Sequence, residues 1–384
     1  MKPLIQYLNV IEDPRDIRGK KYKLTDILIM TIYGILNGHT DFTNIALFLK
    51  LREDYFTNLL NLEYGTPSHD CLSDVFANIN SNKFMEQFIL WIKDVVKNNN
   101  SFINIDGKAI KSARDKINGG NTPYIVSAFL SEIGVSIGEV KVDDKSNEIT
   151  AIPELLDLLD IEGATITIDA LGTQETIINK IKEKKAHYVL KVKDNQKDLK
   201  DDIKTYFDMT LKDKHNKDEI IVYDTGFEKD HGRIEHREYF ISYNTDIILN
   251  KEKWSSVNAV GMVRVYREEN DNMSIEEHYY IMDTKINIDY FTRAVRSHWN
   301  IECALHWRLD MIFDEDHSRN RVGNSIENLS IIRKIVFNLA RLDTSFDSKL
   351  SMKARLIHYQ ADFKKIENLF FQFSILFFRL TSTF

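Results

Sequence analysis

The sequence has few of the residues that staple small secreted folds or line soft-metal sites. Its 384 residues include two cysteines, Cys71 and Cys303, which excludes a disulfide scaffold and a cysteine-rich zinc site. It lacks a basic segment followed by an apolar one near Met1, so no secretory signal is expected. Its longest apolar stretches, at 27–36 and 369–378, fall well short of the roughly 20 residues that a membrane helix needs. These absences predict a cytoplasmic protein with no membrane partner.

An excess of basic residues is also missing. The chain has 51 Lys and Arg against 58 Asp and Glu, a net charge of −7. At face value this charge argues against nucleic acid as a partner, but phosphate binding depends on a local patch rather than on the total. Lysines crowd residues 180–204. A solvated helix face explains that run as well as a phosphate-binding surface does.

The hydrophobic pattern changes along the chain. Residues 1–97 read as several short helices, which fit either a DNA-end-binding module of helix-turn-helix type or a plain helical cap. After residue 98 the pattern alternates with period two, interrupted by two helical stretches. The predicted strands lie at 101–110, 123–132, 134–143, 164–171 and 187–194, and the helices at 148–160 and 174–185. Further strands predict a β-rich insertion at about 207–285, after which the chain is helical again.

Three antiparallel strands followed by helix, strand, helix and strand is the element order of an RNase H-like domain. The predicted fold class is therefore α/β, an RNase H-like mixed sheet with helices, preceded by an all-helical domain and interrupted by the β-rich insertion. The expected domains are 1–97, 98–342 and an atypical apolar tail at 343–384. The tail fits a helix packed on the body or a degenerate, frame-shifted end.

Two of the predicted strands end in an aspartate, INID at Asp106 and ITID at Asp169. In this fold the two strands are neighbours, so both carboxylates are expected side by side at the rim of the sheet. A third acid, Glu302, lies in a later helical stretch, where Asp310 is an alternative on nearly the same face. Three carboxylates make an oxygen site for two Mg²⁺ ions about 4 Å apart, with Mn²⁺ able to substitute, and such a site performs phosphoryl transfer.

The helix predicted around Glu302 also contains histidines. His298, Glu302 and His306 share a face at four-residue spacing, which raises a zinc site as an alternative. The sequence offers no second histidine cluster to support that site. A histidine that hydrogen-bonds a carboxylate or a phosphate is therefore the favoured interpretation.

Several motifs taken together resemble a known family. They are DPRDIRGKKYKLTDIL, GTPSHDCLSDVF, IDGKAIKSARDK, TIDALGTQETIINKI, YVLKVKDNQKDL, HGRIEHRE, RSHWNIECALHWRLDMIFDEDHSRNR and NSIENLSIIRK. They are similar to transposases of bacterial insertion sequences in the H-repeat-associated group, over about residues 7–342. The resemblance implies a DDE transposase, a transposase named for its three metal-binding acids. In it, Asp106, Asp169 and Glu302 bind Mg²⁺, cleave at the element's ends and drive strand transfer into target DNA.

The resemblance also implies partners and a location. The partners would be double-stranded DNA, both the terminal inverted repeats and the target, and further copies of the chain in at least a dimer. The location would be the bacterial cytoplasm, in association with the nucleoid. Neighbouring families carry a Tyr-x2-Arg-x3-Glu-x6-Lys signature, but here its other positions hold Val295, His298 and Leu309. The hairpin-forming role attached to that signature is therefore not expected.

Candidate DNA-contacting side chains are polar or basic residues that follow a strand, flank the first acid, lie in the insertion or lie near Glu302. They are Lys108, Lys111, Lys193, Asn195, Gln196, Arg233, Arg296, His298, Arg319 and Arg321. Ordinary surface solvation explains each single cation as well as a phosphate contact does. Two other functions also stay open, a decayed or domesticated DNA-binding relative and a nuclease of the same fold.

Overall fold

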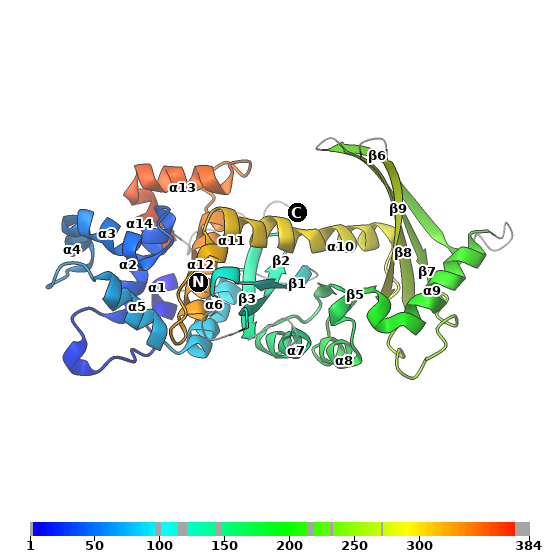
Figure 1. Ribbon diagram of the computed structural model, residues 1–384, viewed down its shortest axis with the longest axis horizontal. Coiled ribbons are helices and arrows are strands. Elements are labelled where there is room, and N and C mark those ends of the chain that lie inside the picture. The colour runs from blue at the N-terminus through cyan, green and yellow to red at the C-terminus, as the bar shows by residue number, and fades with distance from the viewer. Residues whose placement is uncertain are drawn as a thin grey trace. The chain divides into compact units, whose positions relative to one another are not determined.

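The computed structural model describes residues 3–96, 101–113, 121–142, 148–212, 219–230, 233–269 and 272–372. By its internal contacts the chain forms two compact units, whose elements Figure 1 labels. The helical unit comprises residues 1–97, 107–151 and 302–384, and the sheet unit comprises 98–106 and 152–301. Neither unit is one continuous stretch of sequence. The domain boundaries drawn from the sequence, near 97 and 342, stay a prediction.

The first part of the helical unit is a series of short helices. They are α1 (Leu4–Leu8), the 3-10 turn η1 (Ile17–Gly19), α2 (Leu24–Leu36), α3 (Phe42–Leu51), α4 (Glu53–Leu60), α5 (His69–Asn78) and α6 (Ser81–Val95). Side-chain caps start three of the α-helices among them, because Asp41, Ser68 and Asn80 accept hydrogen bonds from the backbone at the beginning of α3, α5 and α6. Local sequence therefore sets where these helices begin.

Helix α12 (Ser325–Leu342) forms the core of the helical unit. It is buried along nearly its whole length and packs against α2, α5, α6 and strand β3 (Val135–Val142). Strand β3 pairs antiparallel with β2 (Tyr124–Leu130) through a turn at Gly134, whose φ of +81° suits glycine. Shorter elements complete this unit, namely η2 (Lys111–Ala113), α11 (Trp307–Met311) and η8 (Glu315–His317). No helix in the described ranges is both long and apolar enough to cross a bilayer.

The last helices of the described chain, α13 (Met352–Ala361) and α14 (Phe363–Gln372), belong to the same unit. The Phe370 ring stacks on Tyr33, and Phe363 packs against the rings of Tyr33, Phe48 and Tyr55. The Tyr55 hydroxyl donates a hydrogen bond of 2.7 Å to a Glu367 carboxylate oxygen. Residues 352–372 are therefore a packed helical pair, one of the two alternatives for the tail, and residues 373–384 lie outside the described part.

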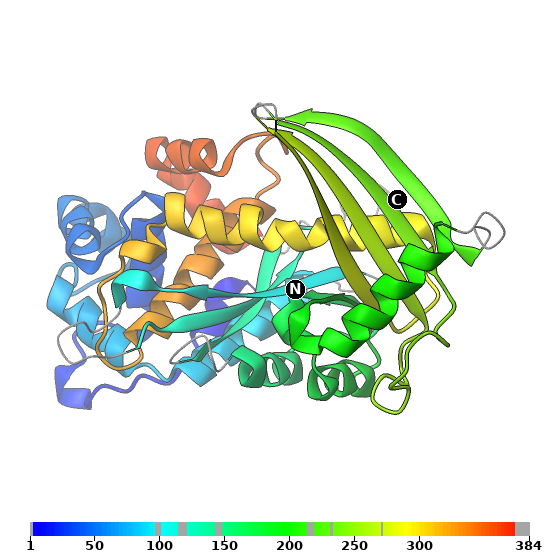
Figure 2. The ribbon, with the colours of Figure 1, turned by 45° about the vertical axis from the view of Figure 1, so that its right-hand side comes forward.

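The sheet unit contains the strands that follow the first aspartate. The first residues of strand β1 (Phe102–Ala109) belong to this unit. Strand β1 pairs in parallel with β4 (Thr165–Ile168), and β4 pairs in parallel with β5 (His187–Val192). The predicted insertion supplies four antiparallel strands, β6 (Ile221–Asp230), β7 (Arg233–Ser242), β8 (Ala259–Glu269) and β9 (Asn272–Met282). These strands continue the sheet, because β9 pairs with β5 (Figure 2).

The predicted mixed α/β character is confirmed. Within the described ranges, hydrogen bonds order nine strands as β3-β2-β1-β4-β5-β9-β8-β7-β6, and the strands predicted from period-two alternation all occur. The remaining helices are α7 (Glu148–Leu158), α8 (Glu175–Glu183), α9 (Lys197–Thr210) and α10 (Ile288–Asn300). Helix α10 packs on β4 within the sheet unit.

Candidate active site

The register of β1 and β4 brings two predicted site residues together. Ile105 lies opposite Ile168 in this parallel pair, and Asp106 and Asp169 each come one residue later. Neighbouring strands run about 4.8 Å apart, and residues at matched positions point to the same face of the sheet. Both aspartates are half-buried, whereas Ile105 and Ile168 are fully buried on the opposite face. By this register the two carboxyl groups lie on one face of the sheet, Asp106 within β1, which continues to Ala109, and Asp169 directly after β4.

A buried polar layer lies on that same face, two residues before each aspartate. The Asn104 side-chain amide donates hydrogen bonds to the Thr167 hydroxyl at 2.7 Å and to the Ser297 hydroxyl of α10 at 3.2 Å. Thr167 Oγ1 also lies 3.0 Å from Nδ1 of His298. The Thr167 hydroxyl can donate to Nδ1 or accept from it, according to the tautomer of His298. This layer fixes α10 on the strands that carry the aspartates.

The sequence analysis did not identify Asn104, Thr167 and Ser297 as part of this neighbourhood. A signal was present in two of them, because each motif, INID and ITID, has a polar residue two positions before its aspartate. In a strand that position lies on the same face as the acid. Ser297 carries no comparable signal in the sequence.

Glu302 lies in an irregular helical segment. Helix α10 is followed directly by a π-helix, Ile301–His306, and then by α11. Glu302 is exposed there, while Ile301 and Leu305 are buried and anchor the segment. π-helical turns are rare, and they occur often at functional sites because they change the direction of side chains. By its contacts Glu302 belongs to the helical unit, whereas Asp106 and Asp169 belong to the sheet unit.

Hydrogen bonds fix the segment that follows Asp169. Asp169 accepts from the Leu171 N–H at 2.9 Å as the cap of the 3-10 turn η4 (Ala170–Gly172). The Asn195 side-chain amide donates to the Ala170 carbonyl oxygen at 2.6 Å, and the Gln196 amide donates to that of Thr173 at 3.0 Å. Asn195 and Gln196, predicted as DNA contacts, therefore use these amide groups to hold the chain beside Asp169.

A completed metal cage is not found in the structure. Among the described residues, no group of three or more His, Cys, Asp or Glu side chains is arranged to hold a metal ion. In the part of the chain that the structure describes, neither the predicted trio of acids nor the zinc alternative with His298 and His306 is therefore arranged as a metal site. What the structure does bring together is the pair Asp106 and Asp169.

Comparisons with known proteins identify the family. Residues 97–339 match the model described as Transposase DDE domain, and residues 5–92 match the one described as DDE_Tnp_1-associated. The chain belongs to the DDE transposase family. It is 36% identical to the putative transposase YncI of Escherichia coli O157:H7, covering 89% of this chain and 88% of that protein. It is 33% identical to the H repeat-associated putative transposase YhhI of Escherichia coli K12, covering 92% and 94%.

The predicted membership of the H-repeat group of DDE transposases is therefore confirmed. Among solved structures, the chain aligns with a piggyBac transposase synaptic complex with hairpin DNA at 12% identity and a TM-score of 0.41. That alignment covers 99% of this chain and 80% of the other. Nothing further is drawn from so distant a likeness.

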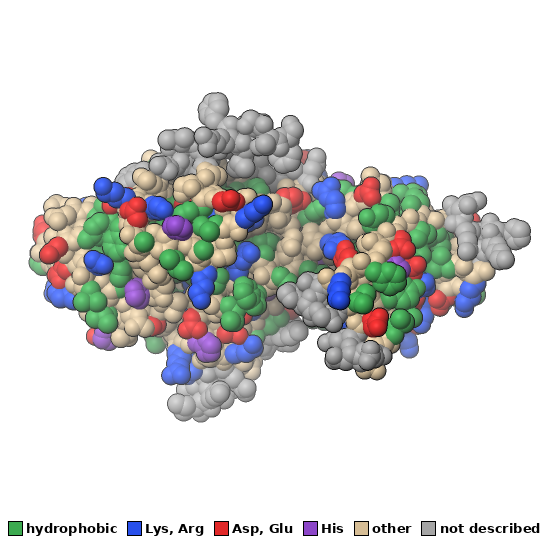
Figure 3. Space-filling model, turned by 90° about the horizontal axis from the view of Figure 1, so that it is seen from above, with side chains coloured by type: hydrophobic (Ala, Val, Ile, Leu, Met, Phe, Trp, Pro, Cys, Tyr) green, Lys and Arg blue, Asp and Glu red, His purple; other side chains and the backbone are tan. Residues whose placement is uncertain are grey.

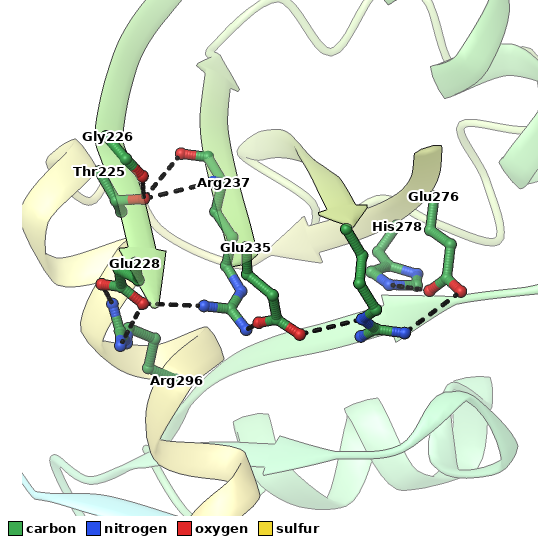
Figure 4. Close-up of polar contacts among 9 residues, drawn as sticks. Thr225, Gly226, Glu228, Glu235, Arg237, Glu276, His278 and Arg296 are labelled. Atoms are coloured by element: carbon green, nitrogen blue, oxygen red, sulfur yellow. Dashed lines mark hydrogen bonds and ion pairs between the residues drawn. The ribbon is translucent and has the colours of Figure 1, made fainter. Parts of the chain in front are cut away.

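Three of this transposase's predicted DNA contacts, Lys108, Lys111 and Arg296, form ion pairs with carboxylates of the same chain. Lys108, with a side chain 10% exposed, pairs with Asp310, with Glu315 at 2.8 Å and with Asp316 at 3.9 Å. Arg296 of α10 pairs with Glu228, which also pairs with Arg237 of β7 (Figure 4). A DNA phosphate would have to compete with these carboxylates.

The candidates also differ in how accessible they are. Lys193 is exposed at the cap of the 3-10 turn η5 (Asp194–Gln196), and Lys111 is exposed beside Asp316 at 2.9 Å. Arg319 is exposed, and Arg321 donates to the Ser112 carbonyl oxygen at 2.9 Å. Arg233 begins β7. On the face that Figure 3 shows, Lys and Arg side chains are interspersed with Asp and Glu, so DNA binding would depend on local groups of cations.

Proposed function

We propose that this protein is the transposase of an insertion sequence, which cleaves DNA at the element's ends and joins those ends to target DNA in a Mg²⁺-dependent reaction. The observation that carries the proposal is the matched position of Asp106 and Asp169 on neighbouring parallel strands, in a chain of the DDE transposase family. The element order is in line with an RNase H-like catalytic domain. A DNA substrate also agrees with the predicted nucleoid-associated location.

The chemistry of the acid pair fits Mg²⁺. Carboxylate oxygens are the ligands this ion prefers, and two of them at matched strand positions provide a shared face for binding. Asp106, Asp169 and Glu302 would hold the metal. When bound, two such ions activate the attacking hydroxyl and stabilise the leaving oxygen of the phosphodiester.

Glu302 is the favoured third ligand for two reasons. It follows His298 by four residues along the chain, and His298 contacts Thr167, two residues before Asp169. Its competitor Asp310 is instead engaged by Lys108, which gives that carboxylate an internal role. Among the chain's own groups, Asn104, Thr167 and Ser297 would hold α10, and Asn195 and Gln196 would keep Asp169 in place.

The decisive experiment uses the purified protein, Mg²⁺, a labelled duplex carrying the element's inverted repeats and a target plasmid. Joined product is expected from the wild type. Asp169→Asn should lower cleavage and joining roughly a thousandfold or more, because a neutral amide is a poor Mg²⁺ ligand, with little change in DNA binding. The control Asp198→Asn changes an exposed aspartate of α9 and should leave product formation unchanged.

The other outcomes identify the alternative functions. Cleavage without joining would indicate a nuclease, and a mobility shift without either product would indicate a DNA-binding relic. Undiminished cleavage by Asp169→Asn would refute the assignment of this acid. Because two ends must be joined together, the active species should be at least a dimer on DNA, which the mass of the complex would reveal.

A further inference from the structure

The helical unit contains a pocket of about 290 Å³ that plays no part in the chemistry described above. Its walls are the beginning of α3, the beginning of α5, residues 314–320 and the side chain of Arg333 from α12. All of these segments belong to the helical unit. Each of the four walls carries a group that attracts anions.

The strongest of these groups is Arg333, a buried cation with an unused donor. Its side chain lines the pocket, and the residue is only 2% exposed. One terminal nitrogen, Nη2, donates to the Thr40 carbonyl oxygen at 3.2 Å, but the buried Nε has no hydrogen-bond acceptor in the described structure. Leaving a buried charged donor unsatisfied is costly, so an acceptor from outside the chain is expected here.

Two helix N-termini form part of the same pocket. Helices α3 and α5 are each ten residues long, and Phe42 and His69, their first residues, line it. The first backbone N–H groups of a helix have no intrahelical acceptor, and the helix dipole adds partial positive charge at this end. Such ends bind phosphate readily when cations lie beside them.

The cations in the pocket have hydrogen-bond donors without an acceptor, although the charge of Arg333 also acts on the buried Glu315. Arg319 is exposed and forms no ion pair or hydrogen bond with any other described residue. By contrast, Asp41 accepts the Asn44 N–H at 2.9 Å as the cap of α3, and Asp314 lies 2.6 Å from Nδ1 of His317. The acidic side chains therefore already have internal partners, whereas Arg319 and Nε of Arg333 remain available for a ligand.

We propose that this pocket binds a backbone phosphate of the DNA on which the transposase acts, with Arg333 and Arg319 as its main ligands. Guanidinium groups suit this role because their planar donors match phosphate oxygens, and phosphate contacts fix the position of a protein on a duplex. The inference rests on the proposed function only in taking DNA as the source of the phosphate.

The test compares Arg319→Gln and Arg333→Gln with the wild type in binding to a labelled DNA duplex over a range of KCl concentrations. Each phosphate contact contributes about 0.9 to the slope of log affinity against log salt, so each variant should lower that slope by about one. The control Arg18→Gln removes a cation that is 88% exposed and pairs with Asp16, and it should keep the wild-type slope. Wild-type slopes in both pocket variants would overturn the proposal.

A second arm identifies the source of the phosphate. Thermal unfolding is measured in inorganic phosphate and in chloride at equal ionic strength. If phosphate stabilises the wild type but not the variants, while the variants bind DNA with wild-type slopes, the pocket serves free phosphate and the DNA proposal is wrong. Circular dichroism checks that Arg333→Gln folds. If Arg333→Gln does not fold, the test rests on Arg319→Gln, which changes an exposed residue.

The strand-joining assay keeps this inference separate from the proposed function. Reduced salt slopes in the pocket variants, together with no joined product from the wild type, would support the phosphate site and refute the transposase reaction. Joined product together with unchanged slopes would support the reaction and refute the site.

Discussion

Glu315 and Asp169 are two carboxylates held in opposite ways. Glu315 of the helical unit is 2% exposed; burial acts to raise its pKa, but Lys108, Lys334 and Arg333 outweigh burial and lower the pKa to about 2. Asp169 of the sheet unit is half-buried and accepts the Leu171 N–H, and no lysine or arginine pairs with it in the described ranges. The carboxylate of Glu315 is matched by internal cations and stabilises the fold. The carboxylate of Asp169 accepts from a neutral donor, so a cation from outside the chain can still bind it.

Removing the cation beside Glu315 should have the largest effect. Lys108→Met leaves Glu315 and Asp310 without their shared partner, and breaking a buried ion pair costs about 3–5 kcal/mol. The free energy of unfolding in urea measures this loss. Lys111→Met is the matched control, because its side chain is 76% exposed and its pair with Asp316 contributes less than about 1 kcal/mol. Equal losses of unfolding free energy in Lys108→Met and Lys111→Met would show that the buried ion pairs stabilise the fold no more than the exposed one.

Acid should weaken the helical unit through Glu315. The pKa of this group is about 2 in the folded chain and 4.5 when unperturbed, so its ionisation stabilises the fold above pH 4.5. That contribution, roughly 3 kcal/mol, is lost as the pH falls from 4.5 towards 2. Glu315→Gln should therefore show a flatter decline of unfolding free energy over this window. The control Glu86→Gln changes a carboxylate whose side chain is 45% exposed and pairs with Lys83 on the surface, and it should follow the wild type. A parallel decline in Glu315→Gln would contradict the prediction.

The smallest predicted effect on stability comes from Asn195, whose side chain holds the segment that follows Asp169. Asn195→Ala removes the hydrogen bond to the Ala170 carbonyl oxygen, which should cost about 1 kcal/mol in unfolding free energy. Cleavage should fall about tenfold, since the residues that orient a metal ligand typically contribute that much. Asn78→Ala removes a similar amide-to-carbonyl bond from α5 and should leave cleavage unchanged. If the two variants cleave equally well, Asn195 has no positioning role.

The acid pair was predictable from sequence, because period-two alternation identified both strands and the strand order made them neighbours. Local signals also worked for some helix ends, for example Ser68 at the start of α5. Local signals did not identify the beginning of a helix where several adjacent residues are of a type that favours caps. Thr25, Asp26 and Thr40 are residue types that favour helix caps, yet α2 begins at Leu24 and Asp41 caps α3.

Long-range pairing explains most of what sequence could not predict. Lys108 and Glu315 are 207 positions apart, and nothing local shows that either is buried. Asn195 and Gln196 look like surface amides until the fold brings residues 170–174 beside them. The π-helix around Glu302 also has no sequence signal that the hydrophobic pattern could reveal.

The packing of α14 against Tyr33 has a consequence for the order in which the chain folds during synthesis. Domains usually fold as their residues leave the ribosome, beginning with the N-terminal ones. Here the aromatic cluster of the first helices is completed by Phe363 and Phe370, near the other end of the chain. The helical unit therefore reaches its final packing only after α14 has been synthesised, and a chain that stops before α14 leaves that cluster open to water.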